Sequence, residues 1–175
     1  MNIQFDLPIH YIPEIDILFY LLPKVGVALV IGTLVGAERE YRGKLAGIKT
    51  NALICAASAI FTAVSLMMSD YGSPNSIPSA DVTRIVAQIV SGIGFIGAGA
   101  IFKSSSKVQG LTTAAVIWTV SALGILVGYG IFLSTIVITI SLILFLSFIA
   151  YVEKKFFRNR GSHHSDHHPG NSTMD

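Results

Sequence analysis

Long runs of apolar residues fill most of this chain, and short polar links separate them. A helix needs about 20 apolar residues to cross the roughly 30 Å hydrocarbon layer of a membrane. Segments near this length lie at 17–37, 51–68, 85–102, 111–127 and 131–152. The pattern predicts an all-α integral membrane protein, a bundle of about five transmembrane helices in one domain.

Composition agrees with a chain whose main partner is the lipid bilayer. Of its 175 residues, 52% are hydrophobic and only 13% are charged, whereas soluble domains carry about 25% charged residues. The charged fraction is too small to cover a water-facing surface, which excludes a soluble catalytic domain of this size. A net charge of +2 gives no reason to expect nucleic-acid binding.

The basic residues predict how the helices cross the membrane. Four lie in the 38–50 link, two in the 103–110 link and four in the segment 153–175, which makes ten of the twelve. Five alternating helices place all three regions on one side, and short basic loops stay in the cytoplasm. We therefore expect an outside segment 1–16, a transmembrane domain 17–152 and a disordered cytoplasmic tail 153–175, basic and then His- and Ser-rich.

The start of the first helix is open on sequence grounds. If it begins at Ile17, Lys24 lies about 10 Å deep at 1.5 Å per residue and must extend outward to water. If Pro23 is instead the first helical residue, residues 14–22 lie along the interface. The sequence slightly favours the second form.

Two glycines in the first helix, Gly32 and Gly36, lie four residues apart and therefore on one face. Such a step lets another helix backbone approach closely. Packing within the bundle is the simpler interpretation, and an oligomer contact or moving interface is the alternative. Cys55 lies in an apolar run and is expected to be a buried structural thiol.

The third apolar segment is unusually rich in small residues. On a helical wheel Gln88, Gly92 and Gly99 share one face, and Gly94 and Gly97 share the opposite one. A helix that is thin on two faces fits between two neighbours, so we expect it near the bundle centre; a bend or unwound stretch is the alternative. The spacing also matches a dinucleotide-binding glycine pattern, but the required preceding strand is missing.

The 38–50 link is the richest polar stretch. Its basic residues can set orientation, but Glu38 and Glu40 add little to topology. They either form ion pairs with nearby arginines or act as functional acids, and they are the weak candidates for a metal site.

The fourth helix carries a stripe of small residues, Thr112, Ala115, Thr119 and Ala122, that suits close packing with threonine hydrogen bonds. Trp118 lies in mid-helix and is expected to pack in the core or face lipid.

No enzyme constellation is visible, so we predict that the chain is not an enzyme and has no cofactor. It has no intramembrane histidine, no cysteine cluster and no phosphate-binding loop. The His-rich segment 162–168 is expected to have no specific role, with metal chelation as the alternative.

Three motifs in order closely resemble the MgtC/SapB family of bacterial inner-membrane proteins. They are GTLVGAEREYRGKLAGIKTN at 32–51, AQIVSGIGFIGAGA at 87–100 and GLTTAAVIW at 110–118. The resemblance covers about residues 23–150, from which we expect a short form of the family, without its soluble carboxy-terminal domain. Motif positions carried over are Glu38, Arg39, Gly43, Gly47, Gln88, Gly92, Gly94, Gly97, Gly110, Thr113 and Trp118.

The resemblance implies a multi-pass protein of the bacterial inner membrane with a role in adaptation to low magnesium and related stress, and in survival inside host cells for some members. It also implies a membrane-protein partner, which for the best-known member is the F-type ATP synthase. A homo-oligomer is compatible with this role.

Two functions therefore compete. The first is a regulator that binds another membrane complex through its small-residue faces. The second is a carrier or channel for Mg²⁺, which binds through one or two carboxylates and keeps several waters. The only plausible donors are Glu38, Glu40, Asp70 and Asp81, none of them in mid-membrane, and five helices do not divide into two equal inverted repeats. The sequence favours regulation.

Overall fold

The computed structural model describes residues 14–71, 78–104 and 107–157, without the side chains of 69–71, 78–81 and 157. Within these ranges the chain forms five helices long and apolar enough to span a membrane, which confirms the predicted fold class. The expected segments 1–16 and 153–175, including the His-rich stretch, lie largely outside the described residues. The helices are α1 (Glu14–Tyr41), α2 (Ile48–Tyr71), α3 (Pro78–Gly99), α4 (Leu111–Gly128) and α5 (Phe132–Phe157).

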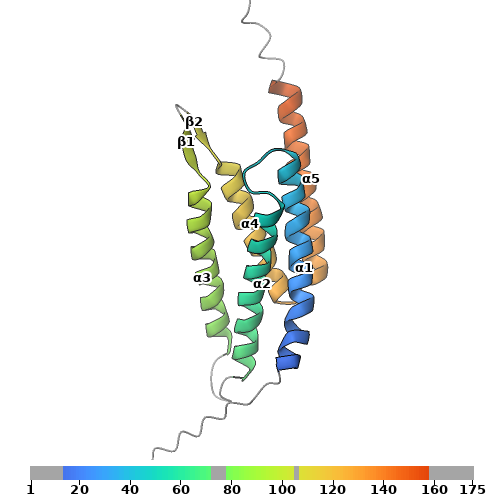
Figure 1. Cartoon of the computed structure of the whole chain (residues 1–175), viewed down its shortest axis with the longest axis vertical. Helices are drawn as coiled ribbons and strands as arrows, with labels where there is room; N and C mark the ends of the chain where they lie inside the picture. The colour runs from blue at the N-terminus through green and yellow to red at the C-terminus, as the bar shows by residue number, and fades with distance from the viewer. Residues whose placement is uncertain (1–13, 72–77, 105–106, 158–175) are drawn as a thin grey trace, which may run out of the picture. The chain divides into compact units, whose positions relative to one another are not determined.

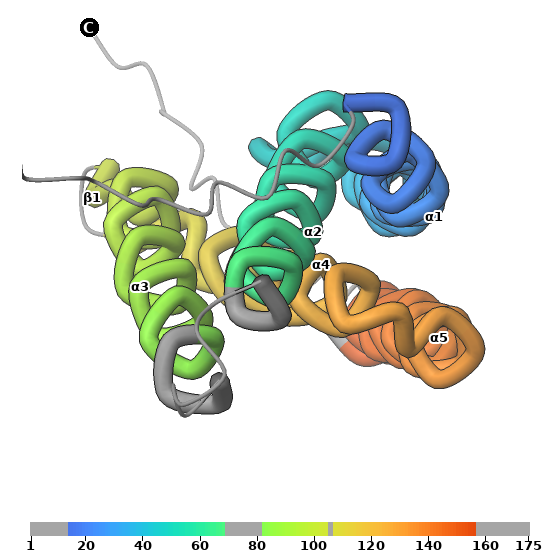
Figure 2. Tube along the Cα trace, turned by 90° about the horizontal axis from the view of Figure 1, so that it is seen from below, coloured from blue at the N-terminus to red at the C-terminus, as the bar shows by residue number. Residues whose placement is uncertain are grey.

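A compact unit extends to Thr139, and α2 and α4 form its centre. Both contact α1 on one side and α3 on the other, as Figure 2 shows. About half of the membrane-spanning residues of α2 and α4 are buried, 50% and 56%, against 17% for α3. The central position predicted for the third helix is therefore wrong. Its glycines leave its surface without side chains, but α3 packs along one edge of the unit and not between two neighbours on opposite faces.

The helix α1 is continuous through Pro23, so the favoured start at that proline is wrong. Lys24 is buried and donates a hydrogen bond of 2.9 Å from Nζ to the carbonyl oxygen of Gly128. Its ammonium also lies 3.7 Å from the centre of the Tyr20 ring. Because Gly128 ends α4, its carbonyl carries the partial negative charge of a helix C-terminus. Lys24 is therefore satisfied inside the unit and does not extend outward to water.

Glycines hold α1 against α2. A Cβ atom at Gly32 would lie 2.6 Å from the Cα of Ala52, and one at Gly36 would lie 2.6 Å from the Cα of Ile48. Both distances are shorter than any real carbon contact, so the two backbones touch only because these side chains are absent. Of the two interpretations open from the sequence, the structure supports packing within the bundle.

A second glycine pair, which the sequence analysis overlooked, holds α4 against α2. A Cβ atom at Gly124 would lie 2.8 Å from the Cβ of Ser58, and one at Gly128 would lie 2.6 Å from the Cβ of Thr62. Beside them the Ser58 and Ser121 hydroxyls share a hydrogen bond of 2.9 Å. The signal was present in the sequence, since Gly124 and Gly128 are four residues apart like Gly32 and Gly36.

The link between α3 and α4 forms an antiparallel hairpin of two short strands, β1 (Phe102–Ser104) and β2 (Lys107–Gln109). It lies at the same end of the unit as the α1–α2 link, as Figure 1 shows. The two internal basic links therefore share one end, as the topology prediction requires. Which side of the membrane this end faces stays a prediction.

The helix α5 begins in this unit, where Thr135 and Thr139 are buried. Each of their hydroxyls bonds to a carbonyl four residues earlier in the helix, Ile131 and Thr135 respectively. From Ile140 to Phe157 the helix belongs to a separate unit. It is mostly apolar, and its last turn carries Lys154 and Lys155.

Candidate functional site

The carboxyl end of α1 is built around Gly43. The Lys44 N–H donates to the Arg39 carbonyl and the Gly43 N–H to the Glu40 carbonyl, both at 3.0 Å. This pair of bonds closes a helix in the Schellman pattern, which needs a left-handed residue just beyond the end. Gly43 has φ of +63°, so this motif glycine is explained by the turn that it makes.

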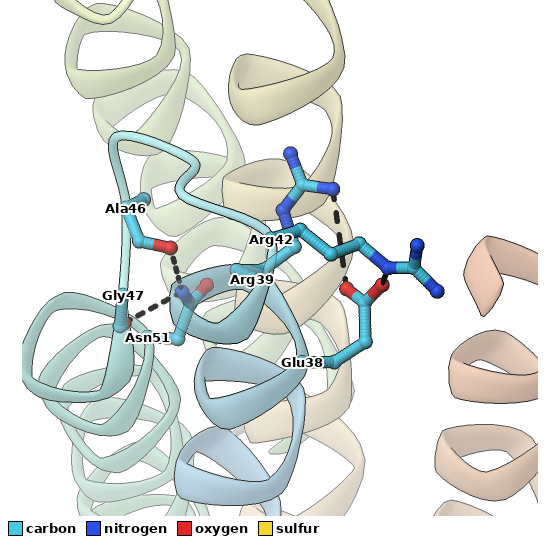
Figure 3. A network of polar contacts seen from close by, with 6 residues as sticks. All are labelled: Glu38, Arg39, Arg42, Ala46, Gly47 and Asn51. Atoms are coloured by element: carbon cyan, nitrogen blue, oxygen red, sulfur yellow. Dashed lines mark hydrogen bonds and ion pairs between the residues drawn. The ribbon is translucent and has the colours of Figure 1, made fainter. Parts of the chain in front are cut away.

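Next to this turn, the Glu38 carboxylate lies between two arginines, as Figure 3 shows. Arg42 donates from Nε to Oε1 of Glu38. The Nη1 atom of Arg39 is 4.0 Å from Oε2, an ion pair too long for a hydrogen bond. The side chains of Glu38 and Arg39 are only 8% and 3% exposed. Of the two alternatives open from the sequence, the structure supports an ion pair for Glu38.

Glu40 has a different role in the same link. Its Oε2 atom accepts a hydrogen bond of 3.0 Å from the Ile48 N–H, at the first residue of α2. A carboxylate there satisfies one of the free N–H groups of a helix start and favours the helix dipole. A Cβ atom at Gly47 would lie 2.5 Å from that same oxygen, which explains this second motif glycine.

Asn51 is a site residue that the sequence analysis missed. It is fully buried, and its Nδ2 donates hydrogen bonds of 2.8 Å to the carbonyls of Ala46 and Gly47. Figure 3 shows the amide pointing back into the link from the first turn of α2. A buried amide at the start of an apolar helix was the signal, because polar groups inside a membrane need internal partners.

Two distant motifs meet at a cleft of about 470 Å³ at this end of the unit. Arg39 and Gly43 line it from the end of α1, and Gly110 and Thr113 line it from the start of α4. Arg39 is the buried charge of this cleft, and its Nε and Nη2 atoms have no hydrogen-bond partner in the described part of the chain.

Two of the motif residues of α3 line a separate, apolar groove against α2. Gln88 and Gly92 lie in it, and its volume is about 590 Å³. A Cβ atom added at Gly97 would lie 3.7–4.0 Å from Ala114 of α4, an ordinary contact distance, whereas one added at Gly94 or Gly99 would meet no atom within 4 Å. Of these three glycines, Gly97 is therefore the one that faces another helix among the described residues.

On α4, the predicted threonine and alanine stripe does not pack against another helix of the unit. Thr112, Ala115 and Ala122 are exposed, and the Thr119 hydroxyl bonds to the carbonyl of Ala115 in its own helix at 2.9 Å. The face that does pack carries the glycine pair described above. Trp118 was expected either to pack in the core or to face lipid. Its side chain is 51% exposed, so it lies on the outer surface of the unit.

Of the predicted metal donors, Glu38 and Glu40 have described side chains, and each makes a different contact. No group of three His, Cys, Asp or Glu side chains that could hold a metal occurs in the described residues. The Asp70 and Asp81 side chains lie outside the described part. Cys55 is fully buried, as predicted for a structural thiol.

Comparison with known proteins adds family relationships. The sequence pattern of the MgtC family matches residues 25–155. Protein MgtC of Brucella abortus (strain 2308) is 44% identical over 116 residues, which is 66% of this chain and 45% of that protein. Protein MgtC of Salmonella typhimurium (strain LT2) is 43% identical over 113 residues, 65% of this chain and 45% of that protein. The chain thus matches less than half the length of these relatives. No solved structure matches it.

Proposed function

Because the chain belongs to the MgtC family, we propose that it regulates a membrane complex by binding one of its transmembrane helices. The regulator acts without enzyme activity, in the bacterial inner membrane, during adaptation to low magnesium. The F-type ATP synthase is one candidate complex by family resemblance.

The groove between α2 and α3 is the observation that carries this proposal. Apolar side chains and small residues line it, among them Ala57 and Ser58 of α2 and Gly92 of α3. Small residues in a membrane-facing groove admit the backbone of another helix. A second transmembrane helix is the occupant that this shape and polarity fit.

One polar side chain gives the groove specificity. Gln88 lies in it, and its side chain is exposed. In hydrocarbon an amide gains from a partner on a neighbouring helix, about 1 kcal/mol in measured cases. We expect the partner helix to present small residues and one hydrogen-bonding side chain opposite Gln88.

The ionic groups of the unit support regulation over transport. Glu38 and Glu40 are engaged by Arg42 and by the Ile48 N–H, and the buried charge near the opposite end is a cation, Lys24. A path for Mg²⁺ needs carboxylate or carbonyl oxygens that the ion can reach. The carboxylates at the end of α1 instead stabilise the fold.

Mg²⁺ uptake into liposomes tests this choice of function. Vesicles containing the purified protein and a trapped Mg²⁺ indicator are expected to show no more uptake than empty vesicles. The Glu38→Gln variant should behave the same, because Glu38 is engaged by the two arginines. An added Mg²⁺ ionophore controls for the indicator. Saturable uptake that Glu38→Gln abolishes would make the protein a carrier.

A further inference from the structure

The cleft between the end of α1 and the start of α4 is not used by the proposed regulatory function. Its lining is rich in donors and contains no carboxylate. Arg39 and Lys44 line it from the α1 side, and Gly110, Thr112 and Thr113 line it at the start of α4. A volume of about 470 Å³ lies in the range of small-ligand sites.

Arg39 is the first sign of a ligand. Its side chain is 3% exposed, and neither Nε nor Nη2 has a hydrogen-bond partner among the described residues. Glu38 does not accept a hydrogen bond from the Arg39 guanidinium. Arg39 Nη1 is 4.0 Å from Glu38 Oε2, and Arg42 donates to the other carboxylate oxygen. A buried guanidinium with unused donors is unfavourable unless an anion accepts from it.

The start of α4 is the second, independent sign. Gly110 precedes the helix in a left-handed conformation, and no side chain caps it. The first α-helical bond seen here is donated by Ala114, so the N–H groups of Leu111, Thr112 and Thr113 have no partner within the helix. Such N–H groups, together with the helix dipole, bind anions.

The surrounding charges keep the cleft positive. Glu38 is outside its lining, and the positive charge of Arg42 balances it. Lys44 lies at the rim. A tetrahedral anion with several acceptor oxygens can bond the guanidinium on one side and the helix N–H groups on the other.

We infer that this cleft binds a phosphate group, held between the Arg39 guanidinium and the first N–H groups of α4. The site lies where α1 leaves its membrane-spanning segment. That level is shared by the phosphates of lipid headgroups and by free phosphate in the adjoining water. Both sources present the same chemistry to the cleft.

Thermal unfolding of the full-length protein in a neutral detergent tests the site. The melting temperature should rise with added inorganic phosphate, or with phosphatidylglycerol in the micelle, since a ligand of the folded state stabilises it. Arg39→Gln should weaken the apparent affinity by at least about tenfold. Lys49→Gln is the matched control, because it removes one exposed positive charge from the first turn of α2, at the same end of the unit but outside the cleft.

The two probes identify the source of the phosphate. A shift with inorganic phosphate assigns the site to a soluble ligand. A shift with phosphatidylglycerol but not phosphatidylcholine assigns it to an anionic lipid. Either shift supports the site if Arg39→Gln loses it and Lys49→Gln keeps it. No shift with either probe, or equal losses in both variants, would overturn the inference.

A second variant separates loss of binding from loss of folding. Thr112→Glu places a carboxylate at the start of α4, where it can occupy the cleft itself. We expect a melting temperature at or above that of the unsubstituted protein and an affinity for the same probe at least about tenfold weaker. Unchanged phosphate affinity in this variant would contradict the assignment to this cleft.

Discussion

Gly36→Ala is expected to destabilise the protein by about 1–3 kcal/mol, the usual cost of inserting a carbon into a close-packed contact. The added Cβ would lie 2.6 Å from the Cα of Ile48. Because the clashing atom is backbone, no side-chain rotation can relieve it. The α1 and α2 backbones would have to separate at the link that positions Glu38 and Arg39.

Gly26→Ala is the matched control for this prediction. It makes the same change in the same helix, at a glycine whose added Cβ would meet nothing within 4 Å. Alanine is the better helix former by up to about 1 kcal/mol, so this variant should be neutral or slightly stabilised. Reversible unfolding in detergent measures both variants. A Gly36→Ala protein that keeps full monomer stability but loses an oligomer would place that face between chains instead.

Gly110→Ala is expected to have the larger effect, about 2–5 kcal/mol, because it combines backbone strain with a clash. Gly110 has φ of +89°, a conformation that L side chains rarely adopt. Its Cβ would overlap the Ala100 carbonyl oxygen and lie 2.9 Å from the Ala100 carbonyl carbon. The substitution would therefore push the start of α4 away from the end of α3.

Gly43→Ala isolates the strain component. Gly43 also has positive φ, +63°, but an added Cβ would meet nothing within 4 Å. This variant should lose only about 1–2 kcal/mol, the usual cost of a left-handed alanine. The same unfolding assay compares the pair, and equal losses at the two positions would show that the contact with Ala100 contributes nothing.

The sequence was sufficient to predict the five membrane-spanning helices and the close contact that Gly32 and Gly36 make. Apolar runs predicted five helices because the length of a membrane span is fixed by the bilayer and not by tertiary contacts. The Gly32 and Gly36 pair predicted a close approach for a similar reason. Only the absence of Cβ atoms lets two helix backbones touch, and this is visible in the residue types.

The position of α3 could not be predicted from its glycines. Small residues show that a neighbour can approach, but they do not show whether that neighbour belongs to the same chain. A Cβ atom added at Gly97 would meet Ala114 of α4, whereas one added at Gly94 or Gly99 would meet no atom within 4 Å. The prediction of a central helix assumed that each glycine-bearing face of α3 packs against another helix of the same chain.

The candidate site was predicted in part. Glu38 and Arg39 were recognised as candidates, as were Gly110 and Thr113, but nothing in the sequence shows that these two motifs line one cleft. That proximity depends on the path of α2 and α3 between them. The sequence also left open whether Glu38 pairs with an arginine, since side-chain geometry decides that.

The most direct test of the proposed regulatory function is photo-crosslinking from the groove in living cells. A benzophenone side chain replaces Phe61, which lines the α2–α3 groove and is 60% exposed. The control replaces Phe95, which is 84% exposed on α3 but is not among the residues of the groove. Adducts are identified by mass spectrometry of the cross-linked peptide.

We expect an adduct from position 61 to a transmembrane segment of one other membrane protein. It should be lost when Gly92→Leu fills the groove, and position 95 should give little of it. Equal adducts from both positions, or an adduct from position 61 only to lipid or to a second copy of this chain, would show that the groove does not bind a helix of another membrane protein.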